Sequence, residues 1–547
     1  MRYVPVFLVF LLIPGGGVLA LYHPVWGGVV AGVGLIGTLV SVSDYLQPSH
    51  AVLRNYPLSA RLRYLLEEFR PEIRQYFVES DQDETPYSRE QRALVYRRAK
   101  GIEGLRPFGT LRDVNEVGHE WINHSMAPTH LESGDFRVTV GGPDCKQPYS
   151  ASVLNISGMS YGALSPNAIE ALNWGASEGG FAHTTGEGSI SRFHRKHGGD
   201  LIWQIGSGYF GCRTSEGCFD EEIFAQKAQD DQVKMIEVKL SQGAKPGHGG
   251  ILPGAKVTEA IAEARGVPVG QACNSPAAHS EFTTPVGLCD FVKRLRDASG
   301  GKPVGIKLCV GHPWEWFAMA KAMRETGIVP DFITIDGSEG GTGAAPVEFA
   351  DHRGAPLHEG LMLVHNTLVG LNLRDRTRLI VSGKLVSAFD ICRMFALGAD
   401  GCNMARGFMF AIGCIQAQAC HTDKCPTGVT TQDPGRYRAL VVDQKYRRVT
   451  NFHANTMHAL KEAVESSGLT HPGELTPHHL MIRVNTRDVR SAASQYEWLS
   501  PGDLEGAQVH HPAFAKYWDG ARTDTFTFAG QPARSPEDGT GGRSAHG

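Results

Sequence analysis

Residues 235–250 read Met-Ile-Glu-Val-Lys-Leu-Ser-Gln-Gly-Ala-Lys-Pro-Gly-His-Gly-Gly. The short apolar run Met235–Leu240 predicts a buried β-strand. The Gly-rich, charged stretch that follows, from Gln242 to Gly250, predicts a loop whose backbone approaches a ligand closely. This unit of a buried strand followed by a functional loop decides the fold, because it recurs along the chain.

Seven further apolar runs of strand length lie on either side of this stretch. With 235–240, the candidate strands are Val153–Ile156, Gly180–Thr184, Leu201–Ile205, Met235–Leu240, Val304–Leu308, Phe332–Ile335, Leu379–Val381 and Gly401–Met404, and helical stretches such as Asn167–Ser177, Glu315–Thr326 and Ala388–Leu397 lie between most of them. Eight strands alternating with helices over about 260 residues predict an α/β fold, a (β/α)8 TIM barrel. A doubly wound sheet is the alternative, but no G-x-G-x-x-G segment lies between a first strand and a helix.

Unusual loops follow four of the candidate strands. They are 157–162 (Ser-Gly-Met-Ser-Tyr-Gly), 185–188 (Thr-Gly-Glu-Gly), 242–250 and 338–343 (Ser-Glu-Gly-Gly-Thr-Gly). In a barrel, the loops after the carboxyl ends of the strands carry the chemistry. Four such loops in one register therefore support the barrel and mark its functional face.

Fixed charges gather on these predicted loops and strand ends: Glu187, Arg192, Lys239, Lys245 and Lys307. Lys307 lies inside the strand pattern 304–308, and an unpaired buried ammonium is costly. An anionic reduced flavin or a carboxylate substrate would supply a partner. A salt bridge to a neighbouring Asp or Glu is the alternative.

Two short segments after the last two candidate strands suit a ligand phosphate, namely Ser382-Gly383-Lys384 and Ala405-Arg406-Gly407. Barrel enzymes often hold a phosphate on Gly-rich loops at this place, where backbone N–H groups and a helix amino terminus receive the anion. Ordinary barrel turns would have the same sequence pattern and are the alternative.

Three cysteines form the sharpest local pattern, Cys414-x5-Cys420-x4-Cys425 followed by Pro426. Thiolates are soft ligands that suit an iron–sulfur cluster, and three ligands favour a three-iron cluster or a four-iron cluster with another ligand. A zinc site with His421 as fourth ligand and three core cysteines are the alternatives. The other cysteines are dispersed, which favours a reducing compartment over a disulfide framework.

The amino terminus carries two uncharged apolar runs, residues 3–22 and 25–42. A bilayer-spanning helix needs about 20 apolar residues, so the runs predict a transmembrane hairpin, although Pro14 and three glycines interrupt the first. A cleaved signal peptide ending near Ala20 is the alternative, but it would not need a second run. Arginines follow the hairpin, so the positive-inside rule places the catalytic domain in the cytoplasm, attached to the inner (cytoplasmic) membrane.

Length and composition indicate how the rest of the chain is divided into parts. The chain has 547 residues and a net charge of −4, and no long Lys/Arg run suggests nucleic-acid binding. The predicted parts are a transmembrane hairpin (1–43), a helical lead-in (44–130), the barrel with its cysteine loop (131–470) and a carboxyl-terminal extension (471–547). The Gly-, Ser- and Pro-rich tail from about residue 530 is predicted to be disordered.

Taken together, five of these segments resemble the FMN-binding synthase domain of the glutamate synthase large subunit. They are Ser157–Ser165, Thr185–Gly188, Lys239–Gly247, Asp336–Gly337 with Gly340–Ala344, and Gly413–Val429. The resemblance covers about residues 120 to 465. A membrane-anchored FMN-binding branch of the family also resembles the amino-terminal hairpin and lead-in.

The resemblance implies an oxidoreductase of the CH–NH2 class, with FMN and a 3Fe–4S cluster, that reduces 2-iminoglutarate, formed from 2-oxoglutarate and ammonia, to L-glutamate. It implies that Lys307 lies near the flavin N1–O2 edge and that Glu187, Lys239, Gln242 and Lys245 serve substrate or flavin. The implied FMN-binding residues are Ser157, Gly158, Met159, Ser160, Lys307, Gly340, Gly341, Gly343, Ser382, Gly383, Lys384, Ala405 and Arg406, and the cluster ligands are Cys414, Cys420 and Cys425.

The sequence departs from the family pattern in several places. No glutaminase domain with a leading nucleophilic Cys is expected, so ammonia would be free or come from a partner. Ser382-Gly383-Lys384 stands where Asp-Gly-Gly is usual, Ser189 stands where Gly is usual, and the 274–279 loop is altered. No pyridine-nucleotide domain is visible, so a ferredoxin or an NADPH-dependent subunit would donate electrons. The alternatives are a related flavoenzyme acting on another amine or oxoacid, and a membrane-associated electron-transfer protein.

Overall fold

The computed structural model describes residues 3–82, 85–102, 104–506, 509 and 511–529. The chain divides into two compact units, Met1–Glu90 and Gln91–Gly547. The segment 91–130, predicted as lead-in, is thus part of the same unit as the predicted barrel. The predicted disordered tail lies outside the described residues.

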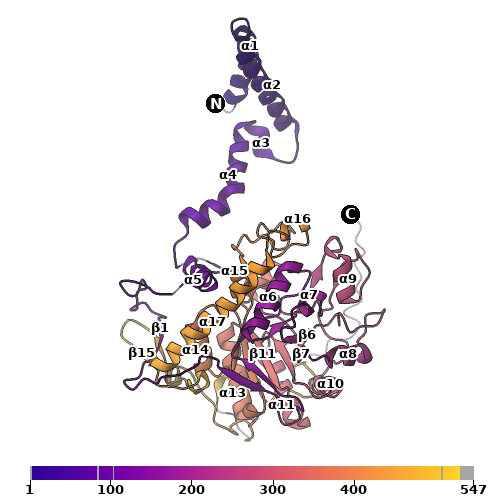
Figure 1. Cartoon of the computed structure of the whole chain (residues 1–547), viewed down its shortest axis with the longest axis vertical. Coiled ribbons are helices and arrows are strands. Elements are labelled where there is room, and N and C mark those ends of the chain that lie inside the picture. Colours follow the sequence, from indigo (N-terminus) through magenta and orange to yellow (C-terminus); the bar gives the residue numbers. More distant parts are fainter. Residues whose placement is uncertain (1–2, 83–84, 103, 507–508, 510, 530–547) are drawn as a thin grey trace. The chain divides into compact units, whose positions relative to one another are not determined.

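The larger unit contains a closed barrel of eight parallel strands (Figure 1), which confirms the predicted (β/α)8 fold. All eight strands were predicted, with boundaries within a few residues. They are β4 (Leu154–Ile156), β5 (His183–Thr184), β6 (Leu201–Ile205), β7 (Val233–Lys239), β10 (Val304–Leu308), β11 (Phe332–Asp336), β12 (Arg378–Ser382) and β13 (Gly401–Met404). The barrel closes where β13 pairs with β4, for example Met404 with Ile156.

A helix follows every barrel strand, and many of these helices begin at a capping side chain. They are α6 (Pro166–Gly179), α7 (Arg192–Arg195), α8 (Glu221–Ala228), α10 (Pro285–Ala298), α11 (Pro313–Thr326), α13 (Leu357–Gly370), α14 (Ala388–Ala396) and α15 (Arg406–Ile412). Ser165 caps α6, Thr284 caps α10, and Ser387 forms a capping box with Asp390 at α14. Such caps satisfy N–H groups that the first helical turn leaves unpaired.

The amino end of the barrel is closed by a hairpin of β2 (Arg137–Val140) and β3 (Tyr149–Ser152). Apolar side chains of this hairpin and of the strand starts form a single buried cluster: Val140, Ala151, Ala182, Ile202, Met235, Phe332 and Ile380. This end is therefore dry and packed, which leaves the carboxyl ends of the strands for ligands.

A buried ion pair ties three elements together at this closed end. Asp331 accepts hydrogen bonds from Arg296 Nε of α10 (3.0 Å), from Gly142 N beyond β2 (2.7 Å) and from Val304 N of β10 (2.8 Å). We expect Asp331→Ala to lower the free energy of unfolding by about 3–5 kcal/mol, because it leaves the Arg296 charge buried and unpaired. Chemical denaturation of the purified protein measures this loss.

The control for this prediction is Asp297→Ala on the same helix. Asp297 pairs with Lys293 at 2.7 Å, but both side chains are exposed. Exposed pairs contribute about 0.2–1 kcal/mol. A similar small effect in both variants would contradict the structural role of Asp331.

Three sets of elements surround the barrel. Between β7 and α10 the chain makes an excursion of β8 (Ile251–Leu252), a short 3-10 helix (Gly254–Lys256), α9 (Glu259–Arg265) and β9 (Cys273–Asn274). α12 (Val347–His352) precedes α13, and α16 (Pro434–Tyr437) precedes the long helix α17 (Val442–Ser466), which packs on α6, α14 and α15. A sheet of β1 (Glu120–Ile122), β14 (Leu480–Arg483) and β15 (Val489–Ser491) joins the two ends of this unit. The remaining short elements are α5 (Arg89–Ala99), α18 (Ala492–Gln495), α19 (Pro512–Ala515) and the 3-10 helices Arg374–Arg376 and Pro472–Glu474.

The smaller unit is a helical hairpin with a helical continuation. α1 (Val4–Ala20) and α2 (Pro24–Leu46) pack closely through glycines: a Cβ on Gly16 would lie 2.4 Å from Ala31 N. Pro14 lies within α1, which continues past it as one helix. α3 (Ala51–Asn55), α4 (Ser59–Ile73) and a π-helix (Arg74–Val78) follow.

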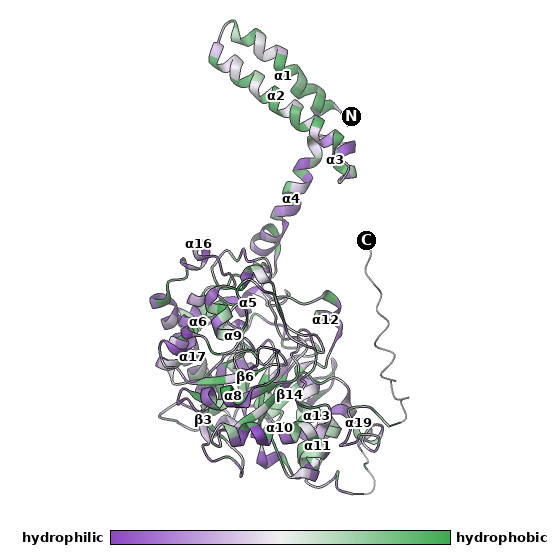
Figure 2. Ribbon diagram, turned by 90° about the vertical axis from the view of Figure 1, so that its right-hand side faces the viewer, coloured by the Kyte–Doolittle hydropathy of each residue, from purple (hydrophilic) through white to green (hydrophobic). Residues whose placement is uncertain are grey.

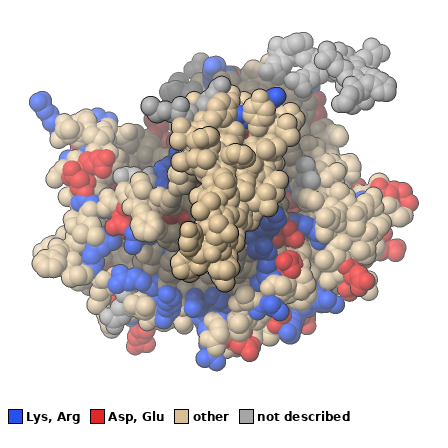
Figure 3. Space-filling model, turned by 90° about the horizontal axis from the view of Figure 1, so that it is seen from above, with Lys and Arg blue, Asp and Glu red and all other residues tan. Residues whose placement is uncertain are grey.

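Both hairpin helices are apolar along their length, as the hydropathy colours of Figure 2 show. In Figure 3 their surface is almost entirely free of charged side chains, whereas both signs of charge are interspersed elsewhere on the visible surface. Among the described residues, α2 alone is long and apolar enough to cross a membrane, with 23 residues and a mean hydropathy of 1.9. α1 is a shorter apolar helix of 17 residues.

Candidate active site and cysteine pocket

The carboxyl end of β7 and the loop after it bring four of the predicted site residues together. Lys239 Nζ lies 3.1 Å from Glu187 Oε1 and donates to Gln242 Oε1 at 2.7 Å. Lys245 is buried close to the same two charges, with 9% of its surface exposed. Residues from the loops after β5 and β7 thus form one polar group at the mouth of the barrel.

Arg265 joins this group from α9, and sequence reasoning missed it. Its Nη2 donates to Tyr161 O at 3.1 Å, and its guanidinium lies 5.0 Å from the centre of the Phe210 ring. No motif marks an arginine 26 residues beyond the end of β7 at the end of a short helix. Only the folding of the excursion back over the barrel places it beside Glu187.

The electrostatics of this group leave positive charge in excess. Burial raises the pKa of Glu187, but Lys239, through charge and a hydrogen bond, with Lys245 and Arg265, outweighs burial and holds that pKa below its usual value. Burial lowers the pKa of Lys245. The charge of Glu187 raises this pKa, and the charge of Lys239 lowers it further. One carboxylate surrounded by three cations forms a site suited to an anionic ligand.

Lys307 lies inside the barrel on β10, and its Nζ is 3.6 Å from Asp336 Oδ2. Burial lowers the pKa of Lys307, but the charges of Asp336 and Glu237 more than offset it, so the pKa is raised and the ammonium is kept. Asp336 also accepts hydrogen bonds from Gly243 N at 2.8 Å and from Ser382 Oγ. The salt bridge that the sequence offered as one alternative is therefore present.

Below Lys307, a buried polar layer continues into the barrel. Glu237 accepts from Thr334 Oγ1 at 2.6 Å and from Gln204 Nε2. The sequence did not single out Glu237, because one acid inside an apolar run does not show which side chains it meets. Its charge helps to keep Lys307 protonated.

The predicted cofactor loops approach neighbouring groups closely, and at Gly243 only glycine fits because the neighbour is backbone. A Cβ on Gly243 would lie 1.7 Å from Gly337 O, and one on Gly341 would lie 2.7 Å from Arg406 Nε. A Cβ on Gly158 would meet the Gln204 side chain at 3.0 Å. In the same loops Ser157 and Met159 are buried and Ser160 and Gly340 are half-buried, whereas a Cβ on Gly343 would have no described atom within 4 Å. The backbone of Ser189, at φ +69°, adopts the left-handed conformation that favours glycine.

The two segments predicted to receive a phosphate present unpaired donors. Within the described part of the chain, the N–H groups of Gly383, Lys384 and Ala405 have no hydrogen-bond acceptor. Burial and the neighbouring Arg406 lower the pKa of Lys384, so two cations lie close together there. Arg406 Nη2 also donates to Glu339 O at 2.7 Å. Unpaired N–H groups beside two cations fit a phosphate, which favours a phosphate site over ordinary turns.

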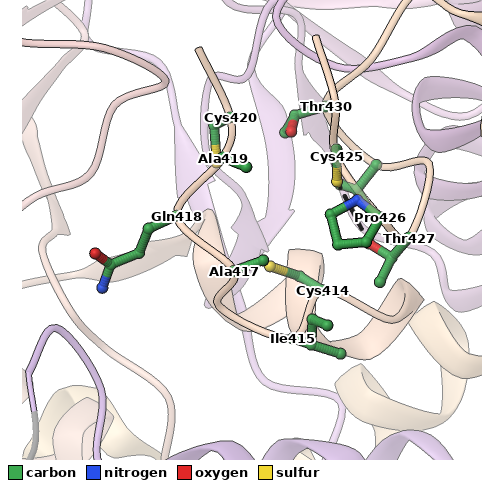
Figure 4. Close-up of a pocket in the computed structure, with 11 residues that line it drawn as sticks. Cys414, Ile415, Ala417, Gln418, Ala419, Cys420, Cys425, Pro426, Thr427 and Thr430 are labelled. Carbon is green, nitrogen blue, oxygen red and sulfur yellow. Dashed lines mark hydrogen bonds between the residues drawn. The ribbon is translucent and has the colours of Figure 1, made fainter. Parts of the chain in front are cut away.

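The three predicted cluster cysteines line one pocket between the end of α15 and the start of α16 (Figure 4). Burial raises the pKa of Cys414 to about 12. Burial acts in the same direction on Cys425, but the neighbouring polar groups of Thr430 and Thr427 outweigh it and lower its pKa to about 7. Cys420 completes the group, and all eleven cysteines of the chain are free thiols.

The lining of the pocket bears on the zinc alternative. Among the described residues, no three His, Cys, Asp or Glu side chains converge closely enough to hold one metal ion. His421 is exposed and does not line the pocket, which disfavours the zinc alternative. A cluster binds each thiolate through a different iron, so its cysteines need not converge on one point.

Neighbouring elements hold the cysteine loop in place. Tyr96 Oη of α5 donates to Cys414 O at 2.7 Å. Lys256, from the excursion after β7, lies 3.5 Å from Asp423 Oδ1 and is almost completely buried. The excursion therefore contacts both the polar group at the mouth and the cysteine loop, a connection that the sequence did not reveal.

Comparison with known proteins gives consistent results. The family described as the conserved region in glutamate synthase matches residues 139–470. The glutamate synthase large subunit-like protein YerD of Bacillus subtilis (strain 168) is 37% identical over 497 residues, which cover 83% of this chain and 94% of that protein. An archaeal-type glutamate synthase (NADPH) of Thermotoga maritima is 35% identical over 312 residues, so this chain spans 58% of its length. A solved mandelate oxidase variant shares 14% identity with a TM-score of 0.39 over 80% of this chain, which is too weak a similarity to support a conclusion.

Proposed function

Because this chain belongs to the glutamate synthase family, we propose that it is a flavin- and iron–sulfur-dependent oxidoreductase that reduces 2-iminoglutarate to L-glutamate. The substrate forms from 2-oxoglutarate and ammonia. The observation that carries the proposal is the excess of positive charge at the barrel mouth, where Lys239, Lys245 and Arg265 surround the single carboxylate of Glu187.

The chain's own residues account for binding and polarisation of this substrate. Two carboxylates require two cationic anchors, and we assign these to Lys239 and Lys245. Glu187 stays ionised because of its cationic neighbours. It accepts an N–H hydrogen bond from the imine and so favours the protonated imine, which is the form that accepts hydride most readily. Gln242 orients the Lys239 ammonium through the 2.7 Å hydrogen bond.

FMN fits the loops around this group, and when bound it would supply the hydride. Gly383, Lys384, Ala405 and Arg406 would hold its phosphate through the unpaired N–H groups and the two cations. The loops 157–160 and 340–343, with Ser382, would border its ring and ribityl chain. Lys307 would supply the cation that the reduced, anionic ring requires, since its ammonium is retained in the barrel interior.

An iron–sulfur cluster, which we propose as 3Fe–4S, fits the cysteine pocket. Cys414, Cys420 and Cys425 would each hold one iron, and the neighbouring polar groups of Thr427 and Thr430 favour the thiolate of Cys425 that such bonding needs. The cluster would accept electrons from a partner, either a ferredoxin or an NADPH-dependent subunit. The Thermotoga maritima relative carries NADPH in its name.

We further propose that α1 and α2 insert into the cytoplasmic membrane as a hairpin, with the barrel in the cytoplasm. Support comes from the length and apolarity of α2, from the glycine-mediated packing of α1 on it, and from the arginines that follow. α1 has only 17 residues, but packing against α2 allows it to share the same layer.

The test of the proposed reaction is an anaerobic titration. The protein is purified in mild detergent, its flavin is photoreduced, and the visible spectrum is followed after addition of 2-oxoglutarate, ammonium or both. We expect reoxidation of the flavin only with both, because the imine forms only from both. Absence of reoxidation in every mixture, with flavin present, would indicate another oxoacid or an electron-transfer role. A preparation that binds no flavin would overturn the proposal.

A further inference from the structure

Helix α4 carries an apolar face that the described residues of its own unit leave uncovered. Leu62 is 60% exposed, Leu65 48%, Leu66 53%, Phe69 52% and Ile73 42%. Their spacing of three and four residues places all five on one side of the helix. Isolated exposed leucines are ordinary, but five in one stripe on a 15-residue helix require a partner.

The other side of α4 is charged. Arg63 pairs with Glu67 at 3.0 Å, and both side chains are exposed. Residues 59–78 contain four arginines (61, 63, 70 and 74) and three glutamates (67, 68 and 72). The helix thus has one apolar and one charged side with almost balanced charge, and polar and apolar residues alternate along its ribbon in Figure 2.

An ion pair between the buried carboxylate of Asp44 and the half-exposed side chain of Arg61 fixes the start of α4 at the end of the hairpin. Asp44, in the last turn of α2, is 1% exposed. Its Oδ1 accepts from Arg61 Nη2 at 2.6 Å, and its Oδ2 accepts from Leu58 N at 3.0 Å. Leu58 immediately precedes α4, so both the backbone entry and the first turn of α4 are held by the same carboxylate.

We propose that α4 lies in the headgroup layer of the bilayer, with Leu62, Leu65, Leu66, Phe69 and Ile73 directed towards the hydrocarbon. The inference rests on the proposed membrane hairpin. Asp44 is the only charged residue of α2, so its turn lies at the boundary of the hydrocarbon, where a carboxylate can reach water or a cation. Because Arg61 and Leu58 bind that carboxylate, the first turn of α4 is at the same depth.

Apolar burial, rather than attraction to anionic lipid, holds the helix in this layer. A helix with one apolar face and one strongly charged face is typical of helices that lie in the interface plane. The charges of α4 nearly cancel, so electrostatic attraction to lipid is weak. Zwitterionic phosphatidylcholine is therefore a sufficient partner, and the contact persists at high salt.

The test uses the full-length protein in phosphatidylcholine vesicles that contain nitroxide-labelled lipid. An environment-sensitive fluorophore is attached to single introduced cysteines in a Cys218→Ser parent, because Cys218 is the exposed native thiol. The introduced sites are Leu66→Cys on the apolar face, Glu68→Cys on the opposite face and Leu35→Cys in the middle of α2. Residual labelling of the parent is subtracted.

The expected result is strong quenching by nitroxide lipid at positions 35 and 66 and several-fold weaker quenching at 68, with no change in 0.5 M salt. Quenching at 35 with none at 66 would overturn the surface position of α4 and leave the hairpin intact. A blue-shifted but unquenched label at 66 would show that protein, such as a second copy, covers the face, and would also overturn it. No quenching at 35 would overturn the membrane hairpin itself.

Discussion

The Cys420→Ser variant is expected to lose its bound iron and its paramagnetic signal while the barrel stays folded. Cys414, Cys420 and Cys425 line the same pocket, and a serine hydroxyl is a much poorer ligand for iron than a thiolate. Electron transfer from an external donor to the flavin should fall to background. Photoreduction of the flavin should proceed as in the unchanged protein, because it does not use the cluster.

The matched control is Cys218→Ser, which removes an exposed thiol that does not line the pocket. Iron content by chemical analysis and the low-temperature paramagnetic spectrum should be unchanged in this control. A full iron content and an unchanged spectrum in Cys420→Ser would refute the ligand assignment. Zinc in place of iron in the unchanged protein would instead point to a zinc site.

The second large effect is expected from Lys245→Ala. Lys245 is buried in the polar group with Glu187 and Lys239, and we assign it to a substrate carboxylate. A hydrogen bond to a charged group contributes about 1.5–3 kcal/mol, so kcat/KM for 2-oxoglutarate should fall about 10- to 150-fold. Flavin and iron contents should be retained, which separates a substrate role from a cofactor role.

Lys234→Ala provides the control for this variant. Lys234 lies near the amino end of the same strand, β7, where it is 3.7 Å from Asp200 and far from the mouth in the register of the barrel. The kcat/KM of the Lys234→Ala variant should equal that of the unchanged protein. If Lys245→Ala kept full activity with 2-oxoglutarate and ammonium, the substrate assignment would be wrong and an electron-transfer role would gain support.

Much of the fold and of the site follows from local sequence. Buried parallel strands such as β12, with Leu379, Ile380 and Val381 in succession, contain continuous apolar runs because both of their faces are covered, and they alternate visibly with helices. Glycine-rich segments such as 242–250 mark places where two backbones approach closely. A Cβ on Gly243 would lie 1.7 Å from Gly337 O, so a side chain has no room there. The spacing of Cys414, Cys420 and Cys425 places three thiols on one loop, so their proximity needed no tertiary information.

Other features depend on contacts between residues that are far apart in the chain. The partner of Lys307 is Asp336, and the cation that joins Glu187 is Arg265. Nothing near Arg265 in the sequence distinguishes it from a surface arginine on a short helix.

The sequence by itself determined the barrel, the glycine-rich loops after its strands and the cysteine loop, because each depends on local periodicity or local spacing. Only the tertiary structure decided which charges are neighbours, how the excursion after β7 connects the mouth with the cysteine loop through Lys256, and that residues 91–130 belong to the barrel unit. Charge pairing depends on distance in space, and the closure of the barrel brings together strands that are separated by up to about 250 residues.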